Sequence, residues 1–257
     1  MPLWLIQTTF IEILKRMKNE KIVFITHSAL ADPGEVGQAL RMIGYKTDIC
    51  CPLLGDSLPE LYKGKLKEYA ASVVFGGPMF VSDADEMDFL NDEITWVSEQ
   101  LQNNAPILGI CLGAQIIAHC LGAKVWTHPE DVREIGYHEV YATCTGNHLF
   151  PESLKVYHWH REGFDLPDGA HLLATGGKAF YNQAFQYGEN AYAVQFHPEM
   201  NLPTMERWIT SELGAPQLSL SGAQPAELQR AEAPDNNRRM RIWLNNFLDI
   251  WLKPLKD

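Results

Sequence analysis

The stretch Ile107–Gln115 has the sequence ILGICLGAQ and places Cys111 between two glycines, directly after a short apolar run and directly before an apolar helical segment, Ala114–Leu121. In such a strand–turn–helix the central residue has a strained backbone, and the flanking glycines avoid clashes with the neighbouring strand and helix. The helix directs its free N–H groups and its positive end at the sulfur, which favours the thiolate. The stretch predicts a nucleophile at the carboxyl end of a strand, although a structural buried cysteine also fits this motif taken alone.

Short apolar runs alternate with helical spacing throughout the first half of the chain. The runs typical of strands are Lys21–Thr26, Thr47–Cys51, Ser72–Phe75 and Ile107–Ile110, and helical spacing occurs in Pro33–Gly44 and Met87–Gln102. Strands that are apolar on both faces and separated by helices indicate a buried, mostly parallel sheet with helices on each side. We therefore expect an α/β fold.

The second half of the chain has a different pattern. From Val125 onward strand-like segments follow one another closely: Glu139–Thr143, Lys155–Trp159, His171–Ala174, Ala184–Tyr187 and Ala191–Phe196. Turn sequences such as Pro167-Asp168-Gly169 separate them. This region should hold added β-hairpins and return one strand to the central sheet.

Four regions are expected along the chain. Residues 1–20 mix apolar and charged residues and predict a helical leader, and residues 21–213 form the main domain. Residues 214–235, rich in Ala, Pro, Gln and Ser, predict a flexible loop. Residues 236–257 predict a terminal helix that packs on the domain through Trp243, Phe247 and Trp251.

Composition limits the classes of partner. The 257 residues have a net charge of −11 with scattered basic side chains, which argues against nucleic acid or an anionic membrane as a partner. The five cysteines include no C-x-x-C pair, which argues against a disulfide framework and a zinc ribbon. No apolar run is long enough to cross a bilayer. We expect a cytoplasmic protein that needs no cofactor and no metal.

A candidate base for Cys111 follows the strand-like segment Ala191–Phe196. This segment ends in His197-Pro198-Glu199, so it delivers His197 to the carboxyl edge of the sheet, where Cys111 also lies if the two strands are parallel. In an H-x-E pair on extended chain both side chains point to the same side, so Glu199 can orient the imidazole. The pattern predicts a nucleophile, a base and an orienting carboxylate.

An oxyanion site is predicted after the Ser72–Phe75 strand. Gly76-Gly77-Pro78 follows it, and a glycine lets a backbone N–H approach a substrate oxygen closely. The N–H of Gly77 and the N–H of Leu112 would form a two-donor hole. A plain turn explains the G-G-P sequence equally well when it is taken alone.

Together, G-G-P, the G-x-C-x-G-x-Q motif of Gly109–Gln115 and the strand ending in H-P-E resemble the class I, triad-type glutamine amidotransferases over about Lys21–Met200. The resemblance implies a flavodoxin-like three-layer αβα fold in which Cys111 attacks the side-chain carbonyl of glutamine, His197 moves protons and Glu199 orients it. The pocket residues implied by the resemblance are Gln115, Pro78, Trp159 and His160.

One departure from the family pattern leaves the substrate open. Where free-standing members have W-H-G-D, this chain has Trp159-His160-Arg161-Glu162, and an added Arg can pair with a carboxylate. Because no synthase domain follows Met200, we expect a free-standing enzyme or one that works with a separate synthase subunit. A γ-glutamyl peptidase or hydrolase acting on γ-glutamyl conjugates is the alternative.

Two further alternatives lie outside that chemistry. A metal-binding protein would use His158 and His160, which share a strand face, together with His197 or Glu199. A non-catalytic regulatory subunit would keep the triad residues without turnover.

Overall fold

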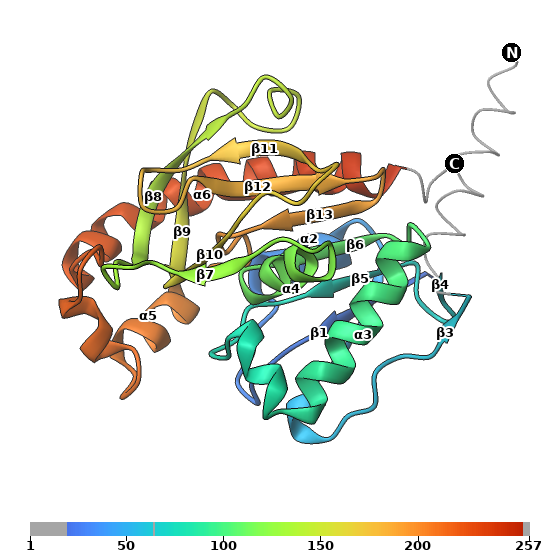
Figure 1. The fold of residues 1–257 in the computed structure, drawn as a ribbon. Coiled ribbons are helices and arrows are strands. Elements are labelled where there is room, and N and C mark those ends of the chain that lie inside the picture. Colours follow the sequence, from blue (N-terminus) through green and yellow to red (C-terminus); the bar gives the residue numbers. More distant parts are fainter. Residues whose placement is uncertain (1–19, 64, 254–257) are drawn as a thin grey trace, which may run out of the picture.

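The computed structural model describes residues 20–63 and 65–253, which form a central β-sheet with helices on both faces (Figure 1). The strands are β1 Lys21–Ile25, β2 Lys46–Cys50, β3 Leu61–Tyr62, β4 Lys65–Leu66, β5 Ala71–Val74, β6 Ile107–Ile110, β7 Val125–Thr127, β8 Glu134–Ala142, β9 Ser153–His160, β10 Glu162–Phe164, β11 His171–Thr175, β12 Asn182–Tyr187 and β13 Ala191–Val194. The α-helices are α2 Gly34–Met42, α3 Asp88–Gln102, α4 Leu112–Cys120, α5 Leu202–Thr210 and α6 Ala226–Trp251, and short 3₁₀ turns lie at Pro52–Leu54, Val81–Asp85 and Ala215–Ser219.

The sheet has nine strands in the order β2-β1-β5-β6-β13-β12-β11-β8-β9. The strands β2, β1, β5, β6 and β13 pair in parallel. The other four strands of this sheet, β12, β11, β8 and β9, continue it by antiparallel pairing, as expected for the hairpin region. Two small two-stranded sheets, β10-β7 and β3-β4, are separate from it. The parallel strands β5, β6 and β13 are neighbours, so their carboxyl ends meet at one edge of the sheet.

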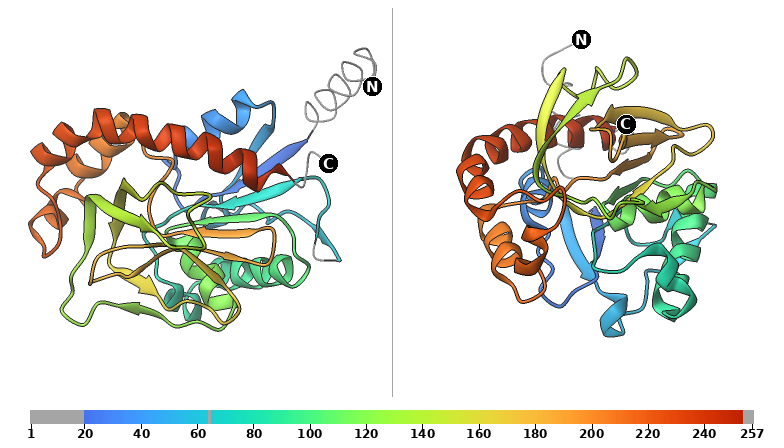
Figure 2. Two further views of the ribbon diagram at one scale, coloured as in Figure 1. Left: turned by 90° about the horizontal axis from the view of Figure 1, so that it is seen from above. Right: turned by 60° about the vertical axis from the view of Figure 1, so that its left-hand side comes forward.

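Helices cover the two faces of the sheet, which confirms the three-layer αβα architecture (Figure 2). One apolar cluster joins the sheet to α2 and α6, with side chains such as Leu40 and Trp243. A second cluster joins the opposite face to α3 and α4, with side chains such as Val97 and Ile117. The strands β1, β5, β6 and β13 are buried almost throughout, which explains their continuous apolar sequences.

The C-terminal region corrects one prediction. Residues 214–235, expected as a flexible loop, contain the 3₁₀ turn Ala215–Ser219 and the first part of α6, which begins at Ala226 and not at residue 236. Pro234, one of the prolines of this segment, lies inside α6. The helix continues because Gln229 and Ala233 are buried, and Tyr157 donates a 2.8 Å hydrogen bond to Gln229. Tertiary packing outweighs the local cost of the proline.

The helical leader predicted for residues 1–20 lies outside the described residues except for residue 20. Among the residues that are described, none of the helices combines the length and the apolar character that crossing a membrane requires.

Candidate active site

The turn between β6 and α4 holds Cys111 in a backbone conformation that side chains rarely adopt, with φ 52° and ψ −105°. The glycines on either side leave no room for a side chain. A Cβ at Gly109 would lie 2.5 Å from the carbonyl oxygen of Gly113, and a Cβ at Gly113 would lie 2.1 Å from the carbonyl oxygen of Val74. The close contact of α4 with β5 and β6 therefore imposes both glycines and fixes Cys111 at the sheet edge.

His197 and Glu199 follow β13 and form a buried pair at the same edge. The His197 Nδ1–H donates a 2.7 Å hydrogen bond to Glu199 Oε1, and the two residues are 3% and 4% exposed. The segment is fixed from two sides. The His197 N–H donates to the carbonyl of Tyr157, and the carbonyl of Glu199 accepts from the N–H of Glu35 in α2.

Gly76, at the end of β5, brings the cysteine and the histidine together. A Cβ at this position would lie 2.9 Å from Cε1 of His197 and 3.3 Å from Cβ of Cys111. Both side chains therefore lie against the same glycine. His197 Nε2 is buried and bonds to no nitrogen or oxygen atom among the described residues, and its interaction with Cys111 suits it to exchange a proton with the thiol or a substrate.

The charges around His197 favour its protonated form. Burial opposes a positive imidazole, but the carboxylate of Glu199 and then the sulfur of Cys111 outweigh it and raise the pKa of His197 to about 10. His197 therefore holds a proton at neutral pH. In general, a positively charged imidazole beside a cysteine stabilises the thiolate form of that cysteine.

His27 and Glu93 support the G-G-P loop, and the sequence analysis missed both. His27 donates from Nδ1 to the carbonyl of Gly76 at 3.2 Å and from Nε2 to Glu93 at 3.0 Å, and the His27 and Glu93 side chains are fully buried. Burial opposes the charge, yet Glu93 and the Gly76 carbonyl raise the pKa of His27. The signal in the sequence was a histidine two residues after β1, the strand next to β5.

The two predicted oxyanion donors lie on adjacent elements. Gly77 is packed so that a Cβ there would lie 2.7 Å from Cβ of His27 and 3.0 Å from Cδ2 of Leu112. Leu112 is the first residue of α4 and is buried. Pro78, which follows Gly77, is exposed.

Gln115 is bonded to the protein rather than open to a ligand. It is 3% exposed, and its Nε2 donates to the carbonyl of Glu162 at 3.2 Å and to Gln195 Oε1 at 3.3 Å. The first contact connects α4 to the segment that follows β9, and the second connects it to the residue that follows β13. Gln115 thus fixes the position of that segment, and its predicted contact with substrate would require these bonds to change.

Trp159 and His160 of β9 have different surroundings. The carbonyl of Trp159 lies 3.9 Å from Sγ of Cys111, which places this part of β9 beside the nucleophile. His160 is 7% exposed, and both of its ring nitrogens contact protein atoms, Glu162 O at 2.9 Å and Glu134 Oε2 at 3.1 Å. Strand pairing directs the ring of His160 toward β8, so its predicted contact with substrate would require these bonds to change.

The group of residues that could hold a metal ion differs from the one expected from the sequence. His158 and His160 group with Glu134 of β8, and neither His197 nor Glu199 belongs to that group. The reason is the pleat of the sheet. Glu134 pairs with His160 across β8 and β9, and alternate residues of a strand share a face, so Glu134, His158 and His160 lie on the same face of the sheet.

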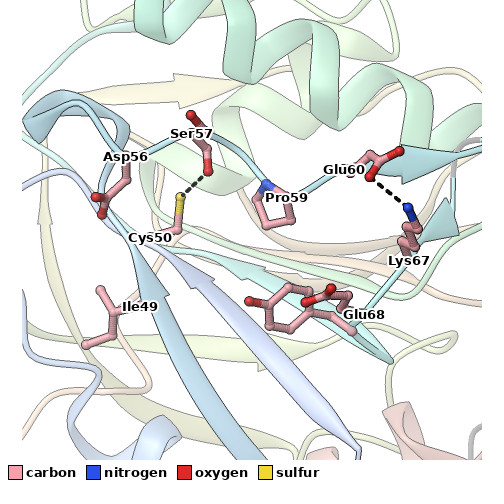
Figure 3. Close-up of a pocket in the computed structure, with 9 residues that line it drawn as sticks. Ile49, Cys50, Asp56, Ser57, Pro59, Glu60, Lys67 and Glu68 are labelled. Atoms are coloured by element: carbon pink, nitrogen blue, oxygen red, sulfur yellow. Dashed lines mark hydrogen bonds and ion pairs between the residues drawn. The ribbon is translucent and has the colours of Figure 1, made fainter.

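Two other cysteines are unsuited to nucleophilic attack. Burial raises the pKa of Cys50 to about 11 and that of Cys120 to about 12. Cys50 lines a pocket of about 430 Å³ between β2 and the segment that leads to β3 and β4, where its thiol donates to the carbonyl of Ser57 (Figure 3). This pocket contains none of the triad residues.

The fold agrees with comparisons to known proteins. Residues 36–213 match the family model of the class I glutamine amidotransferases, so the chain belongs to this family. The glutamine amidotransferase-like protein YfeJ of Salmonella typhimurium is 29% identical over 231 residues, which cover 87% of this chain and 90% of YfeJ.

Solved structures and larger enzymes are also similar. The crystal structure of a glutamine amidotransferase from Thermotoga maritima superimposes with a TM-score of 0.81 at 30% identity, and the match covers 91% of this chain and 99% of that one. A GMP synthase of Bacteroides thetaiotaomicron is 32% identical over 132 residues, which are 50% of this chain and 24% of the synthase. This chain thus spans about a quarter of the larger enzyme.

Proposed function

We propose that this protein hydrolyses the side-chain amide of glutamine through a γ-glutamyl thioester on Cys111. The observation behind the proposal is the convergence of Cys111, at a strained elbow, with the buried His197–Glu199 pair against Gly76. Family membership supports glutamine as the substrate, and this geometry supports Cys111, His197 and Glu199 as the residues that act on it.

In the proposed reaction the Cys111 thiolate attacks the amide carbon, and the carbonyl π electrons move onto oxygen. The N–H groups of Gly77 and Leu112 are the proposed donors to that oxyanion, and each such donor is typically worth about 2.7–4 kcal/mol. His197 gives its proton to the leaving nitrogen, and the C–N bond breaks to release ammonia. Water then adds to the thioester with His197 as base, and glutamate leaves as the C–S bond breaks.

The test is release of glutamate and ammonia from glutamine by the wild-type protein and by Cys111→Ala. We expect the substitution to lower kcat by at least about a thousandfold, because the rest of a triad contributes little without its nucleophile. Cys144→Ala is the matched control, since Cys144 is an exposed free cysteine and should leave activity unchanged.

A glutamine analogue with an electrophilic carbon separates an enzyme from a non-catalytic subunit. We expect one covalent adduct at Cys111, located by peptide mass spectrometry. An intact triad that neither releases glutamate nor forms this adduct would support the regulatory subunit and refute the proposed hydrolysis.

A second candidate reaction, cleavage of γ-glutamyl conjugates, is favoured by Arg161. Its guanidinium lies 4.4 Å from the ring centre of Phe80, in the segment after the G-G-P loop, and its buried Nε has no hydrogen-bond partner among the described residues. A γ-glutamyl dipeptide has a second carboxylate, which an arginine can bind with charge-assisted hydrogen bonds.

Arg161→Met tests this candidate, because it keeps the apolar length of the side chain and removes the charge. If the conjugate is the substrate, kcat/KM for a γ-glutamyl dipeptide should fall about tenfold or more while kcat/KM for glutamine changes little. Equal effects on both substrates would count against a dipeptide-specific role for Arg161.

A further inference from the structure

Three side chains of metal-binding type meet between β8 and β9, away from the triad. Glu134 is paired directly with His160 across the two antiparallel strands, which lie side by side in Figure 1. His158 precedes His160 by two residues, so both imidazoles are on the same face of β9. All three residues are buried, with exposures of 6%, 0% and 7% for Glu134, His158 and His160.

The three facing atoms have the spacing of a coordination shell. His160 Nε2 lies 3.1 Å from His158 Nδ1 and 3.1 Å from Glu134 Oε2, and His158 Nδ1 lies 3.5 Å from the same oxygen. A tetrahedral zinc ion with ligand bonds of about 2.0–2.2 Å has its ligand atoms about 3.3–3.6 Å apart. The side chains are thus arranged to bind an ion after shifts of a few tenths of an ångström.

Hydrogen bonds alone satisfy this cluster poorly. His160 Nδ1 must carry a hydrogen, because it contacts the carbonyl oxygen of Glu162 at 2.9 Å, so a neutral His160 presents a lone pair to the carboxylate of Glu134. A cation at the centre would receive a lone pair from all three atoms.

The surroundings have the features that support metal ligands. The bond from His160 Nδ1 to Glu162 O fixes the ring orientation, and Gln183 Nε2 donates to Glu134 Oε2 at 2.8 Å. Such second contacts orient metal ligands in known sites. Phe180 packs edge-on against His160 with ring centres 4.8 Å apart, which excludes water from one side.

We propose that Glu134, His158 and His160 bind one divalent cation of the zinc type. Two imidazoles and one carboxylate suit Zn²⁺ better than Mg²⁺ or Ca²⁺, which prefer oxygen ligands. The ion would join β8 to β9 and hold His160, whose partner Glu162 also accepts from Gln115 of α4. The proposed role is structural support for the segment beside Cys111, and it does not depend on the proposed glutamine chemistry.

The test is the zinc content of protein without an affinity tag, refolded in excess Zn²⁺ and dialysed, because a buried site is best loaded during folding. Inductively coupled plasma mass spectrometry should find one zinc per chain in the wild type. Glu134→Gln and His160→Gln should each lose at least about tenfold in retained zinc, since even a second contact is worth 10- to 100-fold in affinity. Refolding with Co²⁺ should give the visible absorption of a cobalt site in the wild type alone.

His138→Gln is the matched control. His138 lies on the same face of β8, with its ring centre 5.6 Å from that of His158, but it is not in the cluster. This variant should retain the wild-type zinc content. Circular dichroism checks that each variant folds. Wild-type protein that retains no stoichiometric zinc or cobalt would overturn the proposal whether or not the variants fold, as would equal retention by Glu134→Gln and His138→Gln.

Discussion

Glu199 and His197 form a buried pair joined by a 2.7 Å hydrogen bond, and in the proposed mechanism Glu199 orients His197 as a base. Its charge is the largest favourable influence on the protonated imidazole, and burial works against it. The backbone of Glu199 is held independently by the N–H of Glu35, so the carboxylate can be changed without releasing the turn.

Glu199→Gln should therefore lower kcat for glutamine hydrolysis by about 10²- to 10⁴-fold, because an amide keeps the shape but neither stabilises the charge nor fixes the tautomer. The pH profile of kcat/KM should also change, with the titration of His197 moved to lower pH. A carboxylate with only a structural role would lower stability and leave that profile in place.

The raised pKa of His197 also links stability to pH. The folded value is about 10 and the ordinary value is 6.5, so the folded protein binds the additional proton between these limits. The stabilisation is fully present below about pH 6.5 and is lost as the pH rises toward about 10.

Urea unfolding of the wild type and of His197→Gln, each measured from about pH 6 to about pH 10, tests this sign. The difference in unfolding free energy between the two proteins should decrease as the pH rises. His27, whose pKa is also raised, contributes to both proteins and cancels in the difference. A difference that stays constant or grows with pH would contradict the protonated imidazole.

At the scale of elements, the site depends on how closely α4 approaches the parallel strands. Gly113 lies in the first turn of α4 against the backbone of Val74 in β5, so the helix can begin at the sheet edge only if this position has no side chain. The same contact sets the direction in which Cys111 projects.

Gly113→Ala should destabilise the fold by about 3 kcal/mol, since its Cβ would lie 2.1 Å from a strand carbonyl and α4 would have to move. Thermal or urea unfolding measures the loss. Gly177→Ala is the control. A Cβ at Gly177 would have no atom within 4 Å, so the stability of this variant should stay close to that of the wild type. Equal effects of the two changes would show that the close approach of α4 is not limiting.

At the scale of the whole molecule, α6 is part of the core of the domain. Trp243, Phe247 and Trp251 are buried in the cluster that includes strands of the central sheet, and Trp251 Nε1 donates to the carbonyl of Asn190 at 3.1 Å. The helix also contacts β9 through the bond between Tyr157 and Gln229. These contacts attach α6 to the central sheet and to β9.

Trp251→Ala should lower the unfolding free energy by about 3–5 kcal/mol, the usual loss for a large aromatic residue removed from a core. Ile242→Ala, on the same helix, should change it by less than about 0.5 kcal/mol because Ile242 is 57% exposed. If both substitutions cost the same small amount, α6 would be only loosely attached to the sheet.

The sequence by itself determined the parallel half of the sheet and the elements that carry Cys111 and His197. Continuous apolar strands, helical spacing and the glycines around Cys111 have direct local causes, so their positions could be inferred from short segments. The start of α6 could not be inferred in this way. The helix contains Pro234, and the burial of Gln229 and Ala233 against the rest of the domain stabilises it there.

Only the tertiary structure decided which residues surround Cys111, His197 and Glu199. Cross-strand pairing turns His160 toward Glu134, and the meeting of α4 with the segment after β9 binds the amide of Gln115. The support of Gly76 by His27 also joins residues far apart in the chain. The physical reason is that contacts between distant segments depend on register and on the face of each strand, and neither is encoded in a short motif.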